Sequence, residues 1–178
     1  SSREHHYIEE KIPLYNAIIE ARNLINMPPR DANPESLVHH TLSYKWKQFD
    51  VQVFDQNELE KIGCNLILAV GAGSRKPPYM MLLVPKKPQK WEKYALVGKG
   101  VTFDAGGIQI KPDTAMLDMK CDMSWAAAVL GVAKCLDSLP HLPANVIIAV
   151  GLTENMTGGN AYKPLDIYKA YNGTSVEI

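Results

Sequence analysis

The chain has 178 residues, 46% hydrophobic and 21% charged, a composition typical of a globular domain that excludes disorder for most of its length. Nineteen lysines and arginines balance nineteen aspartates and glutamates, so the overall charge does not favour binding to nucleic acid. No apolar run reaches the roughly 20 residues of a membrane span, and three widely spaced cysteines indicate reduced thiols rather than disulfides. We therefore expect a soluble cytoplasmic protein without a membrane or nucleic-acid partner.

The first half of the chain predicts helices and short strands. Leu14, Ile18 and Ile25 fall on one stripe of a helix whose first position is occupied by Pro13. Asn33 is the expected N-cap of the next helix. The predicted elements are, in order, helices over 13–25 and 33–46, a strand over 51–54, a helix over 55–63 that begins with a capping box, and a strand over 65–70.

Nearly continuous apolar runs in the second half are typical of strands buried on both faces. A hairpin with the turn Asn172-Gly173 is expected at the end of the chain. The predicted elements are strands over 80–84, 94–97 and 144–150, a helix over 124–139, and paired strands over 167–171 and 174–178. The alternation of strands and helices predicts a three-layer α/β domain.

A glycine-rich loop, expected over 98–107, carries the side chains best suited to chemistry. Lys99 and Asp104 lie within it, Lys111 follows, and Asp122 comes just before a predicted helix. Ligands of open α/β sheets bind beyond the carboxyl ends of strands, so two carboxylates and two amines are candidates to meet here. Structural interpretations compete: a phosphate contact for Lys99, although the P-loop pattern is absent, an Asx turn for Asp104 and a helix cap for Asp122.

The two carboxylates are also suited to a metal centre. Asp104 and Asp122 offer hard oxygen ligands for divalent cations, and one carboxylate can bridge two ions. A lysine can join such a centre only as the neutral amine, which requires a strongly lowered pKa. Residue types and spacing do not separate these interpretations, so at this level the function stays open.

Several segments form a series of motifs in a characteristic order. Residues 97–112 read V-G-K-G-V-T-F-D-A-G-G-I-Q-I-K-P, and residues 116–123 read M-L-D-M-K-C-D-M. Further segments are E-A-R-N-L at 20–24, N-M-P-P at 26–29, L-A-V-G at 68–71, E-N-M at 154–156 and A-Y-K-P at 161–164. From about residue 13 to its end, the chain closely resembles the leucyl aminopeptidase (cytosol aminopeptidase) family.

The resemblance implies a metallo-aminopeptidase, a hydrolase that removes N-terminal, leucine-type amino acids from peptides with two divalent ions: zinc, manganese or magnesium. It implies that Lys99 is an amine ligand of one ion, that Asp104 bridges both ions, and that Asp122 completes the first ion's ligands from this part of the chain. Lys111 corresponds to the catalytic lysine, which stabilises the oxyanion. Met119 matches a position that lines the pocket for the first substrate side chain, although it is equally suited to a core.

The resemblance also implies a three-layer α/β/α fold with a mixed sheet, here incomplete at the C-terminus, and a hexamer built from two trimers. Residues 1–29 correspond to a connecting helix region, and residues 30–178 to the N-terminal part of the catalytic domain. Family members continue into N-T-D-A-E-G-R, which provides two more ligands and the arginine that holds a bicarbonate. This difference, together with the apolar strand that ends the chain, predicts a piece of a longer polypeptide. Alternative interpretations are a catalytically inactive fragment, a non-catalytic binding or scaffold module, and phosphate binding by the glycine-rich loop.

Overall fold

The computed structural model describes residues 2–90 and 92–178, without the side chains of residues 2–6 and 10. The helices are α1 (Ser2–Asn26), α2 (Pro34–Ser43), α3 (Gln56–Ile62), α4 (Asn65–Gly71), α5 (Asp113–Met116), the 3-10 helix η1 (Leu117–Cys121) and α6 (Ser124–Asp137). The strands are β1 (Phe49–Phe54), β2 (Tyr79–Pro85), β3 (Lys93–Asp104), β4 (Asn145–Asn155), β5 (Ile167–Lys169) and β6 (Ser175–Glu177).

The first four strands form one mixed sheet in the order β1-β2-β4-β3. β2 pairs antiparallel with β1 and β4, whereas β3 runs parallel to β4. The strands β5 and β6 form a separate antiparallel hairpin, with Gly173 of its turn at a φ of 86°. The predictions of a mixed α/β fold and of a C-terminal hairpin are confirmed.

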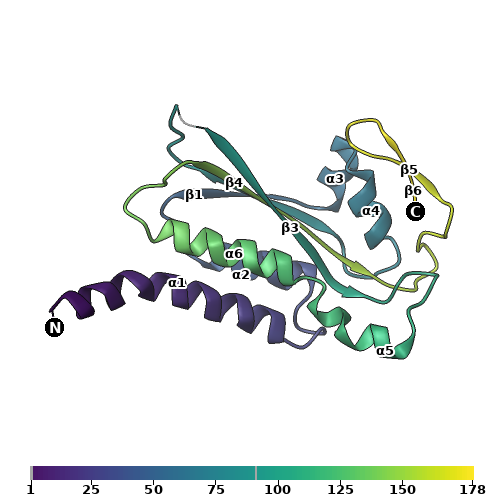
Figure 1. Cartoon of the computed structure of the whole chain (residues 1–178). Helices are drawn as coiled ribbons and strands as arrows, with labels where there is room; N and C mark the ends of the chain where they lie inside the picture. The colour runs from purple at the N-terminus through teal and green to yellow at the C-terminus, as the bar shows by residue number, and fades with distance from the viewer. Residues whose placement is uncertain (1, 91) are drawn as a thin grey trace.

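Helices pack on both faces of this sheet. α6 covers one face of β3 and β4, where a Cβ on Gly98 would lie 2.5 Å from Val129 Cγ2. α1 packs on the outside of α6, and α2 lies on β2 and β4. On the opposite face, α4 brings Ile67 against Gly151 of β4. Figure 1 shows α1, α2 and α6 together on one side of the sheet, with α3 and α4 near the β5–β6 hairpin.

The glycine-rich stretch after residue 97 continues β3 to Asp104, so the prediction of a loop there is wrong for residues 98–104. Gly98 and Gly100 leave room for α6, because a Cβ on Gly100 would lie 3.3 Å from the Ala126 side chain. The lack of a side chain therefore serves close packing of a helix on the sheet. A turn begins only after the strand, where Gly106 and Gly107 have φ values of 93° and 73°.

Four further expectations are corrected. Residues 65–70 form α4 and not a strand, since a short apolar run has the same pattern in a buried helix. The first helix begins at Ser2, with Pro13 inside it, because the preceding residues include good helix formers such as Glu9 and Lys11. The second helix ends at Ser43, before Trp46. Residues 94–97 are not buried on both faces, because β3 lies at the sheet edge and Val97 is 64% exposed.

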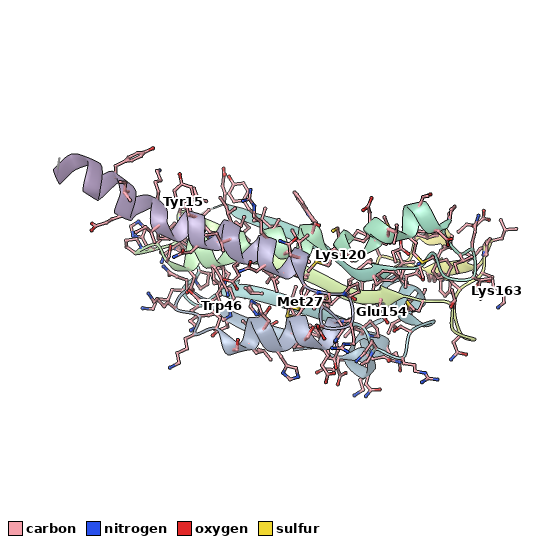
Figure 2. All side chains as sticks on the ribbon, turned by 90° about the horizontal axis from the view of Figure 1, so that it is seen from below. Tyr15, Met27, Trp46, Lys120, Glu154 and Lys163 are labelled. Atoms are coloured by element: carbon pink, nitrogen blue, oxygen red, sulfur yellow. The ribbon has the colours of Figure 1, made fainter. Side chains whose placement is uncertain are left out.

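The chain forms an elongated body, with Tyr15 and Trp46 toward one end and Lys163 at the other (Figure 2). In the described part, no helix combines the length and the apolar character needed to cross a membrane. Near the middle of the body, Lys120 of η1 lies close to the end of α1, where its Nζ donates to the Asn26 carbonyl at 3.5 Å (Figure 2). This contact joins η1 to the first helix.

Candidate functional site

An irregularity in β3 brings Lys99 and Asp104 to the same face of the strand. From Val101 to Asp104, β3 advances by three residues while β4 advances by two, from Thr153 to Asn155. Side chains alternate along a strand, so residues five positions apart in a regular strand lie on opposite faces. The extra residue of this β-bulge cancels the difference, because Lys99 and Asp104 pair with Gly151 and Asn155, which are four positions apart.

Asp104, at the end of β3, forms an ion pair with Lys111. Its Oδ2 lies 3.1 Å from Lys111 Nζ, and the two side chains are 17% and 30% exposed. Its Oδ1 accepts hydrogen bonds from the Gly106 N–H at 3.0 Å and from Asn155 Nδ2 at 2.7 Å. Burial raises the pKa of Asp104, but these three hydrogen bonds and the charge of Lys111 outweigh burial, so the pKa lies below its ordinary value.

The turn after β3 returns Lys111 to Asp104. The Lys111 N–H donates to the Ala105 carbonyl at 3.0 Å, which closes the segment 105–111. Gly106 and Gly107 supply the positive φ values that this turn requires. The hydrogen bond from the Gly106 N–H to Asp104 Oδ1 forms the expected Asx turn. Asp104 therefore both forms this turn and pairs with Lys111.

Asp122 follows η1 and forms an ion pair with Lys99. Its Oδ1 lies 2.8 Å from Lys99 Nζ, and the Asp122 side chain is 18% exposed. Its other oxygen, Oδ2, is buried and has no hydrogen-bond partner among the described residues. The expected helix cap is absent, because Met123 occupies the N-cap position of α6 and makes no side-chain cap bond. Asp122 therefore keeps one carboxylate oxygen free for a further ligand.

A cavity of about 380 Å³ lies beside the first ion pair. It is lined by Asp104, Gly106, Gln109, Ile110, Lys111, Pro112, Asn155, Tyr162, Pro164 and Ile178. Lys99, Asp122 and Met119 are not part of this lining, and Met119 lies half-buried in η1. A larger cavity of about 590 Å³, between α3, α4 and β5, contains none of the predicted site residues. We place the site at the smaller cavity, because the Asp104–Lys111 ion pair lines it.

The four predicted charged residues thus form two carboxylate–lysine pairs anchored on β3 and on the segment that follows it. No hydrogen bond or ion pair joins one pair to the other within the described residues. Two carboxylates, one of them with a buried oxygen that lacks a partner, suit hard divalent cations. The described residues contain no group of three or more His, Cys, Asp or Glu side chains that could hold a metal ion, so these donors fit part of a ligand set.

Sequence reasoning assigned no role to Asn155 or Tyr162, which lie at the same cavity. Asn155 Nδ2 donates to Asp104 and, at 3.3 Å, to Tyr162 Oη. The available signal was the position of Asn155 at the carboxyl end of an apolar strand, where α/β sheets place their ligands. Among the sequence motifs, Asn155 is only one member of the segment 154–156.

These features define an α/β domain with paired acidic and basic side chains at the end of a parallel strand pair. The chain belongs to the cytosol aminopeptidase family, because its residues 19–178 match the profile of that family's catalytic domain. The resemblance seen in the sequence motifs is confirmed.

Relatives with this name cover nearly the whole chain. A "Probable cytosol aminopeptidase" of Hamiltonella defensa subsp. Acyrthosiphon pisum (strain 5AT) is 43% identical over 176 residues, which are 96% of this chain and 35% of the relative. One of Persephonella marina (strain DSM 14350 / EX-H1) is 43% identical over 162 residues, or 88% of this chain and 32% of the relative. The chain therefore spans about a third of the length of these curated relatives.

Solved structures include a similar protein, the bottromycin maturation enzyme BotP in complex with Mn. It superposes with a TM-score of 0.86 at 33% identity, over 99% of this chain and 38% of that chain. A second structure of BotP gives a TM-score of 0.85. The mixed α/β fold is therefore that of BotP over almost the whole length of this chain.

Proposed function

We propose that this chain contributes part of the active site of a two-metal aminopeptidase, which releases N-terminal, leucine-type amino acids from peptides. The observation that carries the proposal is the pairing of Lys99 with Asp122 at 2.8 Å and of Lys111 with Asp104 at 3.1 Å. Each of the four charged residues assigned a role by family resemblance is thus in contact with another of the four. Membership of the cytosol aminopeptidase family supports the type of reaction.

Lys99, Asp104 and Asp122 would hold the divalent ions. The free, buried Oδ2 of Asp122 supports this assignment, because a carboxylate oxygen without a donor favours a cation nearby. When bound, ions such as zinc, manganese or magnesium would supply Lewis acidity that activates water and polarises the scissile carbonyl. The complex of BotP with Mn supports divalent ions as cofactors.

Lys111 would act on the substrate through its ammonium group. Its side chain is 30% exposed at the cavity and is oriented by the carboxylate of Asp104. A fixed cation beside the scissile carbonyl stabilises the negative charge that develops on the oxygen during the attack of water. We further propose that Met119 contacts the first substrate side chain.

The remaining components of the proposal rest on the family resemblance. Two further metal ligands, from the family motif N-T-D-A-E-G-R, stay a prediction from that resemblance. A bicarbonate acting as a base and a hexameric assembly stay predictions from the family resemblance. The name of the relatives, cytosol aminopeptidase, supports a cytoplasmic location.

The test is the hydrolysis of a leucine arylamide by the full-length protein with manganese present. Lys111→Ala should lower kcat by a factor of about 100 to 1,000, the usual loss when one donor to a developing oxyanion is removed. The exposed Lys87, in the loop after β2, supplies the matched control, and Lys87→Ala should keep the wild-type rate. Equal rates for Lys111→Ala and wild type would refute the role of Lys111. A wild-type protein without peptidase activity would favour the non-catalytic binding module instead.

A further inference from the structure

Asn155 ends β4 directly beside Asp104, the last residue of β3. The two residues are register partners in the parallel pair, and the Ala105 N–H donates to the Asn155 carbonyl at 2.8 Å. Asn155 is only 4% exposed. Its side chain is therefore held by the sheet at the carboxylate of Asp104.

The amide orientation of Asn155 is dictated by its neighbours. Nδ2 donates to Asp104 Oδ1 at 2.7 Å and to Tyr162 Oη at 3.3 Å, and an ionised carboxylate can only accept. The opposite end of the amide, Oδ1, is buried without a hydrogen-bond partner among the described residues. A buried carbonyl oxygen without a donor is unfavourable for folding. The amide thus provides a hydrogen bond to Asp104, while its unpaired oxygen makes no contribution to the stability of the strand.

The surroundings of Asp104 leave one of its oxygens available to a cation. Oδ1 accepts from both the Asn155 amide and the Gly106 N–H, whereas the one partner of Oδ2 within the described part of the chain is Lys111 Nζ at 3.1 Å. Space for the amide depends on Gly107, where a Cβ would lie 3.2 Å from Asn155 Oδ1. Asn155 therefore helps to decide which carboxylate oxygen points toward positive charge.

We propose that Asn155 is a positioning residue for Asp104: its amide occupies Oδ1 so that Oδ2 is presented to a cation. In the structure that cation is the Lys111 ammonium, and in the enzyme it would also be a divalent ion. The inference rests on the proposed metal-dependent function. Asn155 itself acts through Asp104.

The experiment replaces the amide by an apolar group of nearly the same shape. Asn155→Leu removes both the donor and the unpaired carbonyl, and Asn155→Ala removes the side chain. We expect both full-length variants to bind Mn²⁺ about 10- to 100-fold more weakly by titration calorimetry, the usual effect of losing a partner that orients a metal ligand. The metal-free Leu variant should unfold at or above the wild-type temperature. A lower unfolding temperature with unchanged Mn²⁺ affinity would mean a purely structural role and would overturn the proposal.

Thr153 supplies the matched control, because it lies two residues earlier in β4, is also 4% exposed and also has a buried side-chain oxygen without a partner among the described residues. Thr153→Val should leave the Mn²⁺ affinity unchanged, and an equal loss there would overturn a specific role for Asn155.

If the wild-type protein binds no Mn²⁺, the proposed function fails, and a crystal structure of metal-free Asn155→Leu decides the inference separately. An Asp104 Oδ2 turned away from Lys111 would support the positioning role, and an unmoved carboxylate would refute it.

Discussion

Leu165 has a backbone conformation that L-residues rarely adopt. Its φ is 73°, and it is the one non-glycine residue with a positive φ among the described residues. The conformation is held by the Leu165 N–H, which donates to the Ile178 carbonyl at 2.8 Å. Its side chain is 74% exposed, so packing does not compensate for the backbone strain. The neighbouring Pro164 and Ile178 line the cavity of Lys111, so the strained turn lies at the edge of the site.

Leu165→Gly should stabilise the protein. A left-handed conformation costs an L-residue about 1–2 kcal/mol, and glycine removes this cost. The greater freedom of glycine in the unfolded chain offsets part of the stabilisation, so we expect the free energy of unfolding to rise by about 0.5–1 kcal/mol. Urea denaturation measures the change. Leu117→Gly is the control, because Leu117 is 79% exposed but has a φ of −56°. That change should destabilise the protein, and equal signs for the two substitutions would contradict the strain at Leu165.

At the scale of elements, Glu20 joins three helices. Its carboxylate in α1 accepts from Lys134 of α6 and lies 2.7 Å from His40 Nε2 of α2. The Glu20 side chain is 26% exposed and that of Lys134 is 15% exposed. Burial raises the pKa of Glu20. The hydrogen bonds and charges of Lys134 and His40 lower the pKa by more than burial raises it, so the pKa lies below the ordinary 4.5.

Glu20→Gln should lower the free energy of unfolding by about 2 kcal/mol at neutral pH, because it removes charged hydrogen bonds and leaves Lys134 without its anion. The lowered pKa means that the stabilisation is complete above pH 4.5 and is lost as the pH falls through the pKa of the folded protein. Urea denaturation of both proteins at neutral and acidic pH should show the difference disappearing in acid.

Glu35→Gln is the matched control for this network. Glu35 is 55% exposed and lies 3.9 Å from His39 in the same helix, so its loss should change stability by no more than about 0.5 kcal/mol. A loss for Glu20→Gln that persists unchanged at acidic pH would contradict the charged network.

Elements with strong local signals could be predicted from the sequence, and elements decided by packing could not. The predicted N-cap at Asn33 and the predicted capping box at Asp55 correctly place the starts of α2 and α3, because their bonds form within a few residues. The apolar run of α4 has no such signal, and its helical state depends on its position against β4 and β5. The glycines of β3 resemble a loop in the sequence because the helix packed on them is far along the chain.

Part of the candidate site could likewise be predicted from the sequence, and part of it could not. Motifs around Lys99, Asp104, Lys111 and Asp122 identified four residues that the structure joins in two pairs. Asn155 was missed because it does not titrate and lies 51 positions from the carboxylate that it contacts. The extra residue in β3 was missed because strand register is decided by the neighbouring strand.

At the scale of the whole molecule, bound metal should stabilise the folded chain. A ligand that binds only the folded state adds about 2.7 kcal/mol when its concentration is about a hundred times its Kd, and this raises the Tm. Manganese should raise the Tm of the full-length protein, and Asp122→Asn should remove that rise. Asp118→Asn, at an exposed position of η1, should keep it. A rise that survives in Asp122→Asn would contradict the assignment of Asp122 as a ligand.

The bulge in β3 makes residue number as important as residue type near the site. Inserting one residue between Val101 and Asp104 would leave both aspartates and both lysines in the chain, yet with the bulge kept it would turn Asp104 to the side of the strand opposite Lys99. A single-residue insertion between Val101 and Asp104 would therefore damage the site more than most exchanges of one side chain for another. A survey restricted to substitutions would overlook this dependence on spacing.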